Sequence, residues 1–229
     1  MEFIKSADTK KGDKALLARL KKELKNNQKV LWLVCGGSGI KSEVKILKAL
    51  RKSLDKELLE RLAIMLMDER YGSLGHKDSN WQQLIEAGAN FDELYAMPML
   101  HKSGLSLEKT VEFYAKLVKT VFDAADVIVG QFGIGADGHT AGILPGSPAA
   151  NNVDKLVVGY EAKPFTRITL THQALKWVDA AYVFAFGKEK KAALSNLKAG
   201  KLQFQQAPSM ILRDLPEAYV FNDQIGKKS

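Results

Sequence analysis

Short runs without polar residues alternate along this chain with longer stretches in which apolar residues recur every three or four positions. The short runs are apolar on both faces, which is typical of strands in a parallel sheet covered by helices. The longer stretches have the spacing of amphipathic helices. The predicted strands are residues 30–35, 62–67, 94–97, 127–129, 156–160, 182–186 and 218–221, and the main predicted helices are residues 13–27, 41–54, 79–88, 106–122 and 171–181.

This alternation predicts an open α/β fold. The sheet is expected to be mainly parallel, doubly wound and Rossmann-like, with helices on both of its faces. A length of 229 residues suits a single domain, residues 1–229, and leaves room for a small extra lobe.

The formal net charge of +8 is concentrated near the N-terminus. Residues 1–29 contain nine Lys and Arg against four Asp and Glu, a net charge of +5. The helix predicted there has no interleaved aromatic residues, so we interpret it as a solvated surface and expect no nucleic-acid partner. The chain has no apolar run of the roughly 20 residues that a membrane span needs, and its N-terminus lacks the apolar core of a signal peptide. We therefore expect a cytoplasmic protein without membrane contacts.

A glycine-rich turn, Gly36, Gly37, Ser38 and Gly39, follows the first buried strand and precedes a helix. Strand, glycine turn and helix in that order direct backbone N–H groups and the positive end of the helix dipole beyond the strand. This order predicts a cradle for a phosphate group, although packing alone also favours glycine in such turns. The single cysteine, Cys35, ends the strand and is expected to be a buried free thiol.

Charged residues stand where an α/β sheet binds its ligands. Asp68, Glu69 and Arg70 directly follow a buried strand and are expected in a loop at its carboxyl end, where a salt bridge is the structural alternative to a binding role. Arg167 precedes another short apolar segment. Lys190 lies in the first turn of a predicted helix, where a cation opposes the helix dipole unless it faces a bound anion.

The stretch 126–148 contains the candidate catalytic groups. Its apolar strand leads into a turn in which Asp137 and His139 stand among glycines, namely Gly130, Gly133, Gly135 and Gly138. A His two residues after an Asp, beyond the end of a strand, is where an α/β protein places a general base. For an isolated D-G-H sequence, local capping by the Asp is the alternative.

Together these segments resemble the 6-phosphogluconolactonases, within the glucosamine-6-phosphate isomerase and lactonase superfamily. The motifs that carry the resemblance are GGS at 36–38, DER at 68–70, DSNW at 78–81, GIGADGHTAGILPGS at 133–147, RITLT at 167–171, GKEK at 187–190 and APSMIL at 207–212. Two departures are visible. Gly39 and Ile40 stand where the family usually has TP, and Gly72 and Ser73 replace its VP.

The resemblance implies hydrolysis of 6-phospho-D-glucono-1,5-lactone to 6-phosphogluconate, in the oxidative pentose phosphate pathway, with no cofactor and no metal. His139 is then expected to take a proton from water, and Asp137 either orients the imidazole or shares the role of base. Arg70 is expected to bind phosphate or to polarise the lactone carbonyl. The residues assigned to the substrate and its phosphate are Gly36, Gly37, Ser38, Gly39, Asp68, Arg167 and Lys190.

Two alternatives belong to the same superfamily. A hexosamine-6-phosphate isomerase or deaminase needs a further acid five residues after the His, where this chain has Leu144, and it carries DEY where this chain has Arg70. A non-catalytic sugar-phosphate-binding protein is the second alternative. A nucleotide-binding oxidoreductase, from another class, is compatible with the glycine turn, but no acidic residue at the end of the second strand distinguishes ribose binding from the DER motif. For the lactonase and for both alternatives within the superfamily, the expected small-molecule partner is a sugar phosphate. We expect the protein to be a monomer or a weak homodimer.

Overall fold

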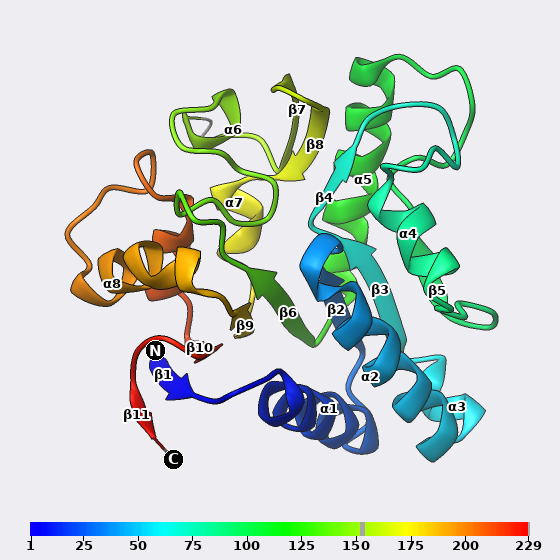
Figure 1. Cartoon of the computed structure of the whole chain (residues 1–229). Helices are drawn as coiled ribbons and strands as arrows, with labels where there is room; N and C mark the ends of the chain where they lie inside the picture. The colour runs from blue at the N-terminus through cyan, green and yellow to red at the C-terminus, as the bar shows by residue number, and fades with distance from the viewer. Residues whose placement is uncertain (152–153, 229) are drawn as a thin grey trace.

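The computed structural model describes residues 1–151 and 154–228, and its centre is one parallel sheet (Figure 1). Eight strands are hydrogen-bonded in the order β11-β1-β10-β9-β6-β2-β3-β5, and each neighbouring pair is parallel. The predicted open, mainly parallel α/β fold is therefore confirmed. The strands are β1 (Glu2–Lys5), β2 (Val30–Val34), β3 (Leu62–Leu66), β5 (Tyr95–Met97), β6 (Val127–Gly133), β9 (Ala180–Ala185), β10 (Glu217–Asn222) and β11 (Lys227–Lys228).

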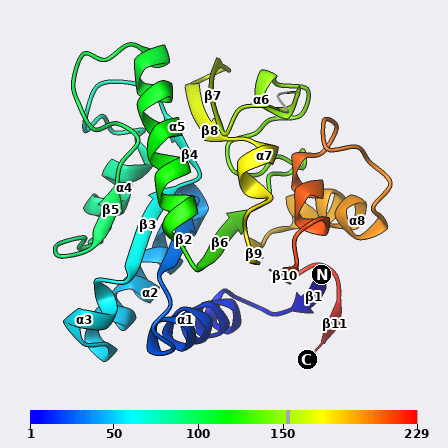
Figure 2. The same cartoon turned by 180° about the vertical axis from the view of Figure 1, so that it is seen from behind.

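Helices cover both faces of this sheet, as expected for a doubly wound fold. α1 and α2 lie in front of the sheet in Figure 1, and α5 lies behind it, where Figure 2 brings it forward. The apolar stripe of α5, including Tyr114, Val118 and Phe122, is buried in the core. The helices are α1 (Lys10–Lys25), α2 (Ile40–Ser53), α3 (Lys56–Leu59), α4 (Asn80–Glu86), α5 (Leu107–Ala124), α6 (Pro148–Asn151), α7 (His172–Leu175) and α8 (Lys191–Ala199), with 3-10 turns η1 (Gly37–Gly39), η2 (Lys188–Lys190) and η3 (Pro208–Arg213).

A second, antiparallel sheet of three strands forms the small extra lobe. It consists of β4 (Asp68–Arg70), β8 (Thr166–Leu170) and β7 (Val157–Glu161), in that order. The expectation that 68–70 is a loop is wrong, because these residues pair with β8, with Arg70 opposite Arg167. Glu69 is fully buried there, and its carboxylate accepts hydrogen bonds from the Ser79 hydroxyl and from the Asn80 and Trp81 amides at the start of α4. Charged residues are compatible with a buried strand when partners of this kind satisfy them.

Other elements differ from the sequence prediction in length or existence. β6 continues beyond Val129, so Gly130 and Gly133 belong to the strand and not to the turn. A Cβ at Gly130 would collide with the ring of Phe132, which accounts for glycine inside a strand. α7 is shorter than the predicted helix at 171–181. The N-terminal strand β1, which was not predicted, pairs with β10.

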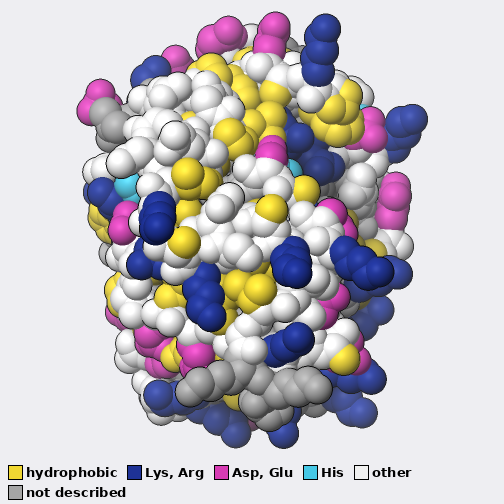
Figure 3. All heavy atoms as spheres, turned by 60° about the vertical axis from the view of Figure 1, so that its left-hand side comes forward, with side chains coloured by type: hydrophobic (Ala, Val, Ile, Leu, Met, Phe, Trp, Pro, Cys, Tyr) yellow, Lys and Arg dark blue, Asp and Glu magenta, His cyan; other side chains and the backbone are white. Residues whose placement is uncertain are grey.

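The basic N-terminal helix packs as the apolar spacing predicts. Leu16, Leu20 and Leu24 of α1 are fully buried, and Arg19 forms an ion pair with Glu217 on β10, with 2.9 Å between nitrogen and oxygen. On the face drawn in Figure 3, Lys and Arg side chains are dispersed among apolar and acidic ones. Among the described residues, no helix is long and apolar enough to cross a membrane.

Candidate active site

The D-G-H loop directly after β6 holds the histidine and the aspartate against each other. Nδ1 of His139 lies 2.6 Å from Oδ1 of Asp137, and the same oxygen accepts the backbone N–H of His139 at 3.1 Å. The backbone closes on itself, because the Gly135 amide donates to the His139 carbonyl and the Gly138 amide to the Gly135 carbonyl. The pair therefore sits on a short, internally bonded loop.

Two glycines of this loop are required by its shape. A Cβ on Gly135 would collide with the imidazole of His139, so only glycine lets the ring lie against the backbone. Gly138 has a φ of +86°, in the region that L side chains disfavour. Its carbonyl accepts the amide of Ser209 from η3, which ties the loop to the APSMIL segment.

The carboxylate of Asp137 fixes which nitrogen of the His139 ring faces it. Partial burial disfavours the charged carboxylate of Asp137, but the hydrogen bond from the His139 amide and the charge of its ring outweigh burial and lower the pKa of Asp137. The carboxylate is then an acceptor only, so Nδ1 of His139 is the nitrogen that carries the proton. Nε2 of the neutral ring is free to accept one. About 40% of the His139 side chain is exposed, so water reaches it.

Two guanidinium groups lie side by side on the small sheet. Arg70 on β4 is directly opposite Arg167 on β8, and both lie over the ring of Phe165, at 5.3 and 5.9 Å from its centroid. Nη1 of Arg70 donates to the Asp78 carbonyl at 3.1 Å. Among the described residues, the buried Nε atoms of both arginines have no hydrogen-bond partner. Like charges directly across a sheet repel each other, so the arrangement favours an anion between them.

Asp68 is the buried counter-charge of these arginines. Its Oδ2 lies 3.8 Å from Nη1 of Arg167, and it is almost completely buried. Burial raises the pKa of Asp68 to about 6, against the opposing effect of Arg70 and Arg167. Gly142 packs against this side chain with a φ of +70°, and a Cβ there would lie 2.7 Å from Cγ of Asp68.

The glycine turn at 36–39 offers fewer free amides than the sequence predicts. The Gly36 amide donates to Oε1 of Glu43 at 3.2 Å, and the Gly39 amide donates to the Gly36 carbonyl at 3.0 Å. The amides of Gly37 and Ser38 are therefore the ones left to face a ligand.

These groups surround one polar cavity of about 170 Å³ at the carboxyl ends of β2, β3, β6 and β9. Of the residues selected from the sequence, Gly39 and Asp137 are not part of its lining. Gly39 lies next to the Cys35 thiol, and Asp137 lies behind His139. Cys35 lies beyond the end of β2 and lines the cavity. It was expected to be the last residue of the strand and buried, but it is only partly buried. The lining residues are Cys35, Gly36, Gly37, Ser38, Asp68, Arg70, Gly133, Ile134, Gly135, His139, Thr140, Ala141, Gly142, Arg167 and Lys190.

Sequence reasoning missed two side chains that shape the cavity. The hydroxyl of Tyr160 donates to the Gly142 carbonyl at 2.6 Å and accepts the Leu144 amide at 3.3 Å, so β7 fixes the segment after His139. Asn80 lies so close to Gly36 that a Cβ there would be 2.6 Å from the Asn80 carboxamide. The DSNW motif contained Asn80, but nothing in the sequence placed it against the glycine turn.

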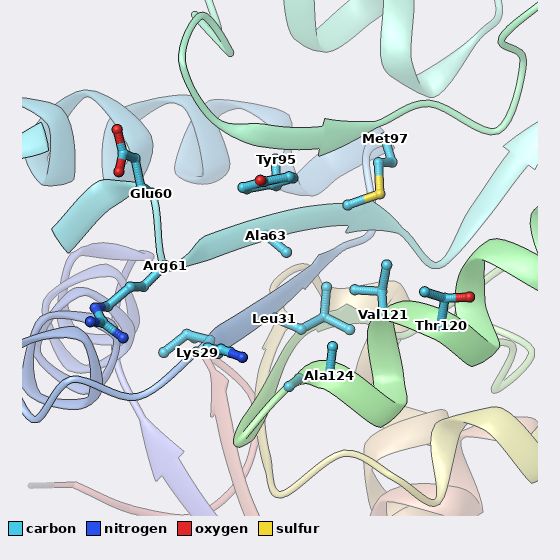
Figure 4. A pocket seen from close by; sticks show the side chains of 12 residues that line it. Lys29, Leu31, Glu60, Arg61, Ala63, Tyr95, Met97, Thr120, Val121 and Ala124 are labelled. Carbon is cyan, nitrogen blue, oxygen red and sulfur yellow. The ribbon is translucent and has the colours of Figure 1, made fainter. Parts of the chain in front are cut away.

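A larger cavity, of about 530 Å³, lies at the opposite end of β2 and β3, beside β5 and the end of α5 (Figure 4). Its floor is apolar, with Leu31, Ala63, Met97 and Val121 facing it from the sheet and α5, and Tyr95 forming one wall. Among the described residues that line it, none is a histidine, cysteine or aspartate. The smaller cavity, with His139 and three cationic side chains, is the one equipped for chemistry.

Comparison with known proteins agrees with this geometry. The family model of glucosamine-6-phosphate isomerases/6-phosphogluconolactonase matches residues 5–220. The chain is 26% identical over 188 residues to a 6-phosphogluconolactonase of Synechocystis sp., covering 77% of this chain and 78% of that protein. It is 24% identical over 209 residues to a 6-phosphogluconolactonase of Nostoc sp., covering 86% and 83%.

Solved structures share the whole fold. A 6-phosphogluconolactonase from Thermotoga maritima superposes with a TM-score of 0.74 at 21% identity, covering 99% of both chains. A monomeric glucosamine-6-phosphate deaminase superposes with a TM-score of 0.76 at 17% identity, covering 97% of both chains. At these identities the similarity establishes the fold and leaves the reaction to be argued from the site. The family model spans nearly the whole chain, and the chain belongs to the glucosamine-6-phosphate isomerase/6-phosphogluconolactonase family.

Proposed function

We propose that this protein hydrolyses 6-phospho-D-glucono-1,5-lactone to 6-phosphogluconate, the lactonase reaction of the oxidative pentose phosphate pathway. The observation that carries the proposal is the convergence of His139 with Arg70, Arg167 and Lys190 on one small polar cavity. A general base and a set of cations are what hydrolysis of a phosphorylated lactone requires. Both relatives described above have the name of this enzyme.

In this mechanism His139 is the general base. Nε2 accepts a proton from a water molecule as the water oxygen attacks the lactone carbonyl carbon. Asp137 holds the other ring nitrogen at 2.6 Å and stabilises the imidazolium that forms. The tetrahedral intermediate then breaks its bond to the ring oxygen, which receives a proton from the imidazolium and becomes the hydroxyl of 6-phosphogluconate.

The phosphate is assigned to cations and amides that line the same cavity. Lys190, Arg167 and the amides of Gly37 and Ser38 bind it, while Gly36 and Gly39 give the turn its shape. Asp68 orients Arg167 and limits the net positive charge. Arg70 either shares the phosphate or polarises the lactone carbonyl, and the two roles differ in whether its loss affects KM or kcat.

The alternative is an isomerase or deaminase acting on a hexosamine 6-phosphate. It is favoured by the family model, which spans isomerases and lactonases alike, and by the fold shared with the monomeric glucosamine-6-phosphate deaminase. That chemistry needs an additional acid for ring opening, and the position expected for it holds Leu144, whose side chain cannot transfer a proton.

We further propose that residues 1–229 form one catalytic domain, since β1 near the N-terminus pairs with β10 near the C-terminus. The protein is expected to act in the cytoplasm as a monomer or weak homodimer, with a sugar phosphate as its small-molecule partner and without a cofactor.

The test is direct. Freshly generated lactone is mixed with the protein at or below neutral pH, and the spontaneous hydrolysis rate is subtracted, with glucosamine 6-phosphate as the control substrate. His139→Asn is expected to reduce kcat by roughly 10²- to 10⁴-fold, the usual contribution of a positioned base, while the fold is retained. The wild-type rate is expected to fall in acid, because a protonated imidazole cannot accept a proton from water. Nearly wild-type turnover by His139→Asn would remove this residue from the mechanism.

A further inference from the structure

A buried glutamate lies directly beneath the glycine turn. Glu43, in the first turn of α2, has only 2% of its surface exposed. Its Oε1 accepts the backbone N–H of Cys35 at 2.8 Å and that of Gly36 at 3.2 Å, so it holds the turn at the point where β2 ends. The Cys35 thiol is a third neighbour, with Sγ at 3.4 Å from the same oxygen.

The second carboxylate oxygen of Glu43, Oε2, differs from Oε1 in its surroundings. Among the described residues, buried Oε2 has no hydrogen-bond partner. A buried, unpartnered carboxylate oxygen strongly disfavours the ionised form, and a proton on Oε2 relieves the charge while Oε1 still accepts both amides. Glu43 can therefore gain or lose a proton while Oε1 keeps its hydrogen bonds to the amides of Cys35 and Gly36.

The unusual turn sequence accommodates this glutamate. A Cβ at Gly39 would lie 2.7 Å from the Cys35 sulfur and 3.1 Å from Oε1 of Glu43. A side chain at this position would thus compete for the space that the thiol and carboxylate occupy. The departure of Gly39 from the usual TP sequence and the buried Glu43 form one structural unit.

The surroundings of Glu43 are mostly apolar. The apolar side chains packed near it come from β2, β3 and α4, including Val34, Ile64 and Leu84. The ionisable groups that act on it are Cys35 in the turn and Asp68 on β4. Burial raises the pKa of Glu43 to about 7, although the hydrogen bonds from Cys35 and Gly36 oppose the rise.

We propose that Glu43 is a positioning residue that fixes the phosphate-binding turn and takes up a proton when a dianion binds there. The inference takes from the proposed function only the position of the dianion, which is at the amides of Gly37 and Ser38. A negative charge on Glu43, which bonds the amide of the adjacent Gly36, opposes the dianion, and a bound dianion in turn favours protonated Glu43. Binding and proton uptake are linked, so the affinity for the dianion falls as pH rises and Glu43 ionises.

Sulfate is the appropriate probe because it stays a dianion between pH 6 and 9, whereas phosphate titrates. Sulfate binding is measured by calorimetry at several pH values, each in two buffers of different ionisation enthalpy, which gives the number of protons taken up. Asp68, whose pKa burial also raises, lies near the site, so the informative quantity is the difference between wild type and Glu43→Gln. In this variant the side-chain amide oxygen can still accept both backbone N–H groups, but the side chain carries no charge.

For the wild type we expect proton uptake near pH 7.5 that is absent or smaller in E43Q. A one-unit rise in the pKa of Glu43 on binding corresponds to an additional loss of about tenfold in wild-type sulfate affinity between pH 6 and 9, relative to E43Q. Glu43→Leu removes the acceptor as well, and it is expected to weaken sulfate binding at every pH. Glu57→Gln, which removes an exposed carboxylate on α3, is the matched control and is expected to behave as wild type.

Equal proton uptake and parallel pH profiles for wild type and E43Q would overturn the proposal. If E43Q does not fold, the carboxyl carbon resonance of Glu43 in isotope-labelled wild type replaces it. Its titration midpoint is expected to rise with saturating sulfate, and an unchanged midpoint would also overturn the proposal. These readouts need no lactone, so a failure of the proposed lactonase activity is distinguishable from a failure of this inference.

Discussion

The buried carboxyl of Glu43 also makes a prediction about stability. Burial raises its pKa from 4.5 to about 7, so between these values the native protein holds a proton that the unfolded chain has released. The unfolded state binds fewer protons in this window, and the free energy of unfolding therefore falls as pH rises from about 4.5 to about 7. Above about pH 7 no further stability is lost through Glu43. In Glu43→Gln this dependence of stability on pH is absent.

The two pKa values set the magnitude. The difference between 4.5 and about 7 corresponds to about 3 kcal/mol at most, and about 2 to 3 kcal/mol of it falls between pH 5 and pH 8. Asp68, whose pKa burial raises to about 6, adds a similar dependence at lower pH. This second contribution is present in wild type and in Glu43→Gln, and because Asp68 acts on Glu43, the difference between the two proteins reports the titration of Glu43 together with this coupling.

The assay is urea unfolding of both proteins at pH 5, 6, 7 and 8, followed by circular dichroism and analysed by linear extrapolation. We expect the stability of Glu43→Gln relative to wild type to increase by about 2 to 3 kcal/mol from pH 5 to pH 8. The slope with urea should be the same for both proteins, since the fold does not change. A difference that stays constant across this pH range would refute the burial of an ionisable Glu43.

Three further predictions concern the site. Asp137→Asn should lower kcat by less than removal of the histidine if Asp137 orients the ring, and comparably if it shares the base role, as single-turnover rates would reveal. Arg167→Ala and Lys190→Ala should raise KM more than they lower kcat, and a wild-type KM at low ionic strength would contradict the assigned phosphate contact. Gly142→Ala should reduce activity and destabilise the fold by about 1 kcal/mol or more, measured by thermal unfolding, because of its φ of +70° and the proximity of Asp68.

The sequence alone was sufficient where the determining pattern is local. Strands without polar residues, such as β2 and β3, can be stable only between covering helices, so their alternation with amphipathic helices predicts a parallel sheet. The D-G-H loop was likewise recognisable, because its glycines, Asp137 and His139 are close together in the chain. Parallel strands end at a common edge, and for this reason the residues after β2, β3, β6 and β9 line one cavity.

Only the tertiary structure decided what depends on partners distant in the chain. The charged residues 68–70 form a strand because β8, about 100 residues later, pairs with them. The backbone amides at the start of α4 also donate hydrogen bonds to the buried carboxylate of Glu69. Likewise, residues 2–5 form β1 because β10 is available as a parallel pairing partner. Glu43 lies four residues before Leu47 and seven before Leu50, on the apolar stripe of α2, where a charged side chain needs partners to be tolerated. It is buried because the amides of Cys35 and Gly36 turn toward it, and the direction of a backbone amide is set by the assembled fold, not by residue type.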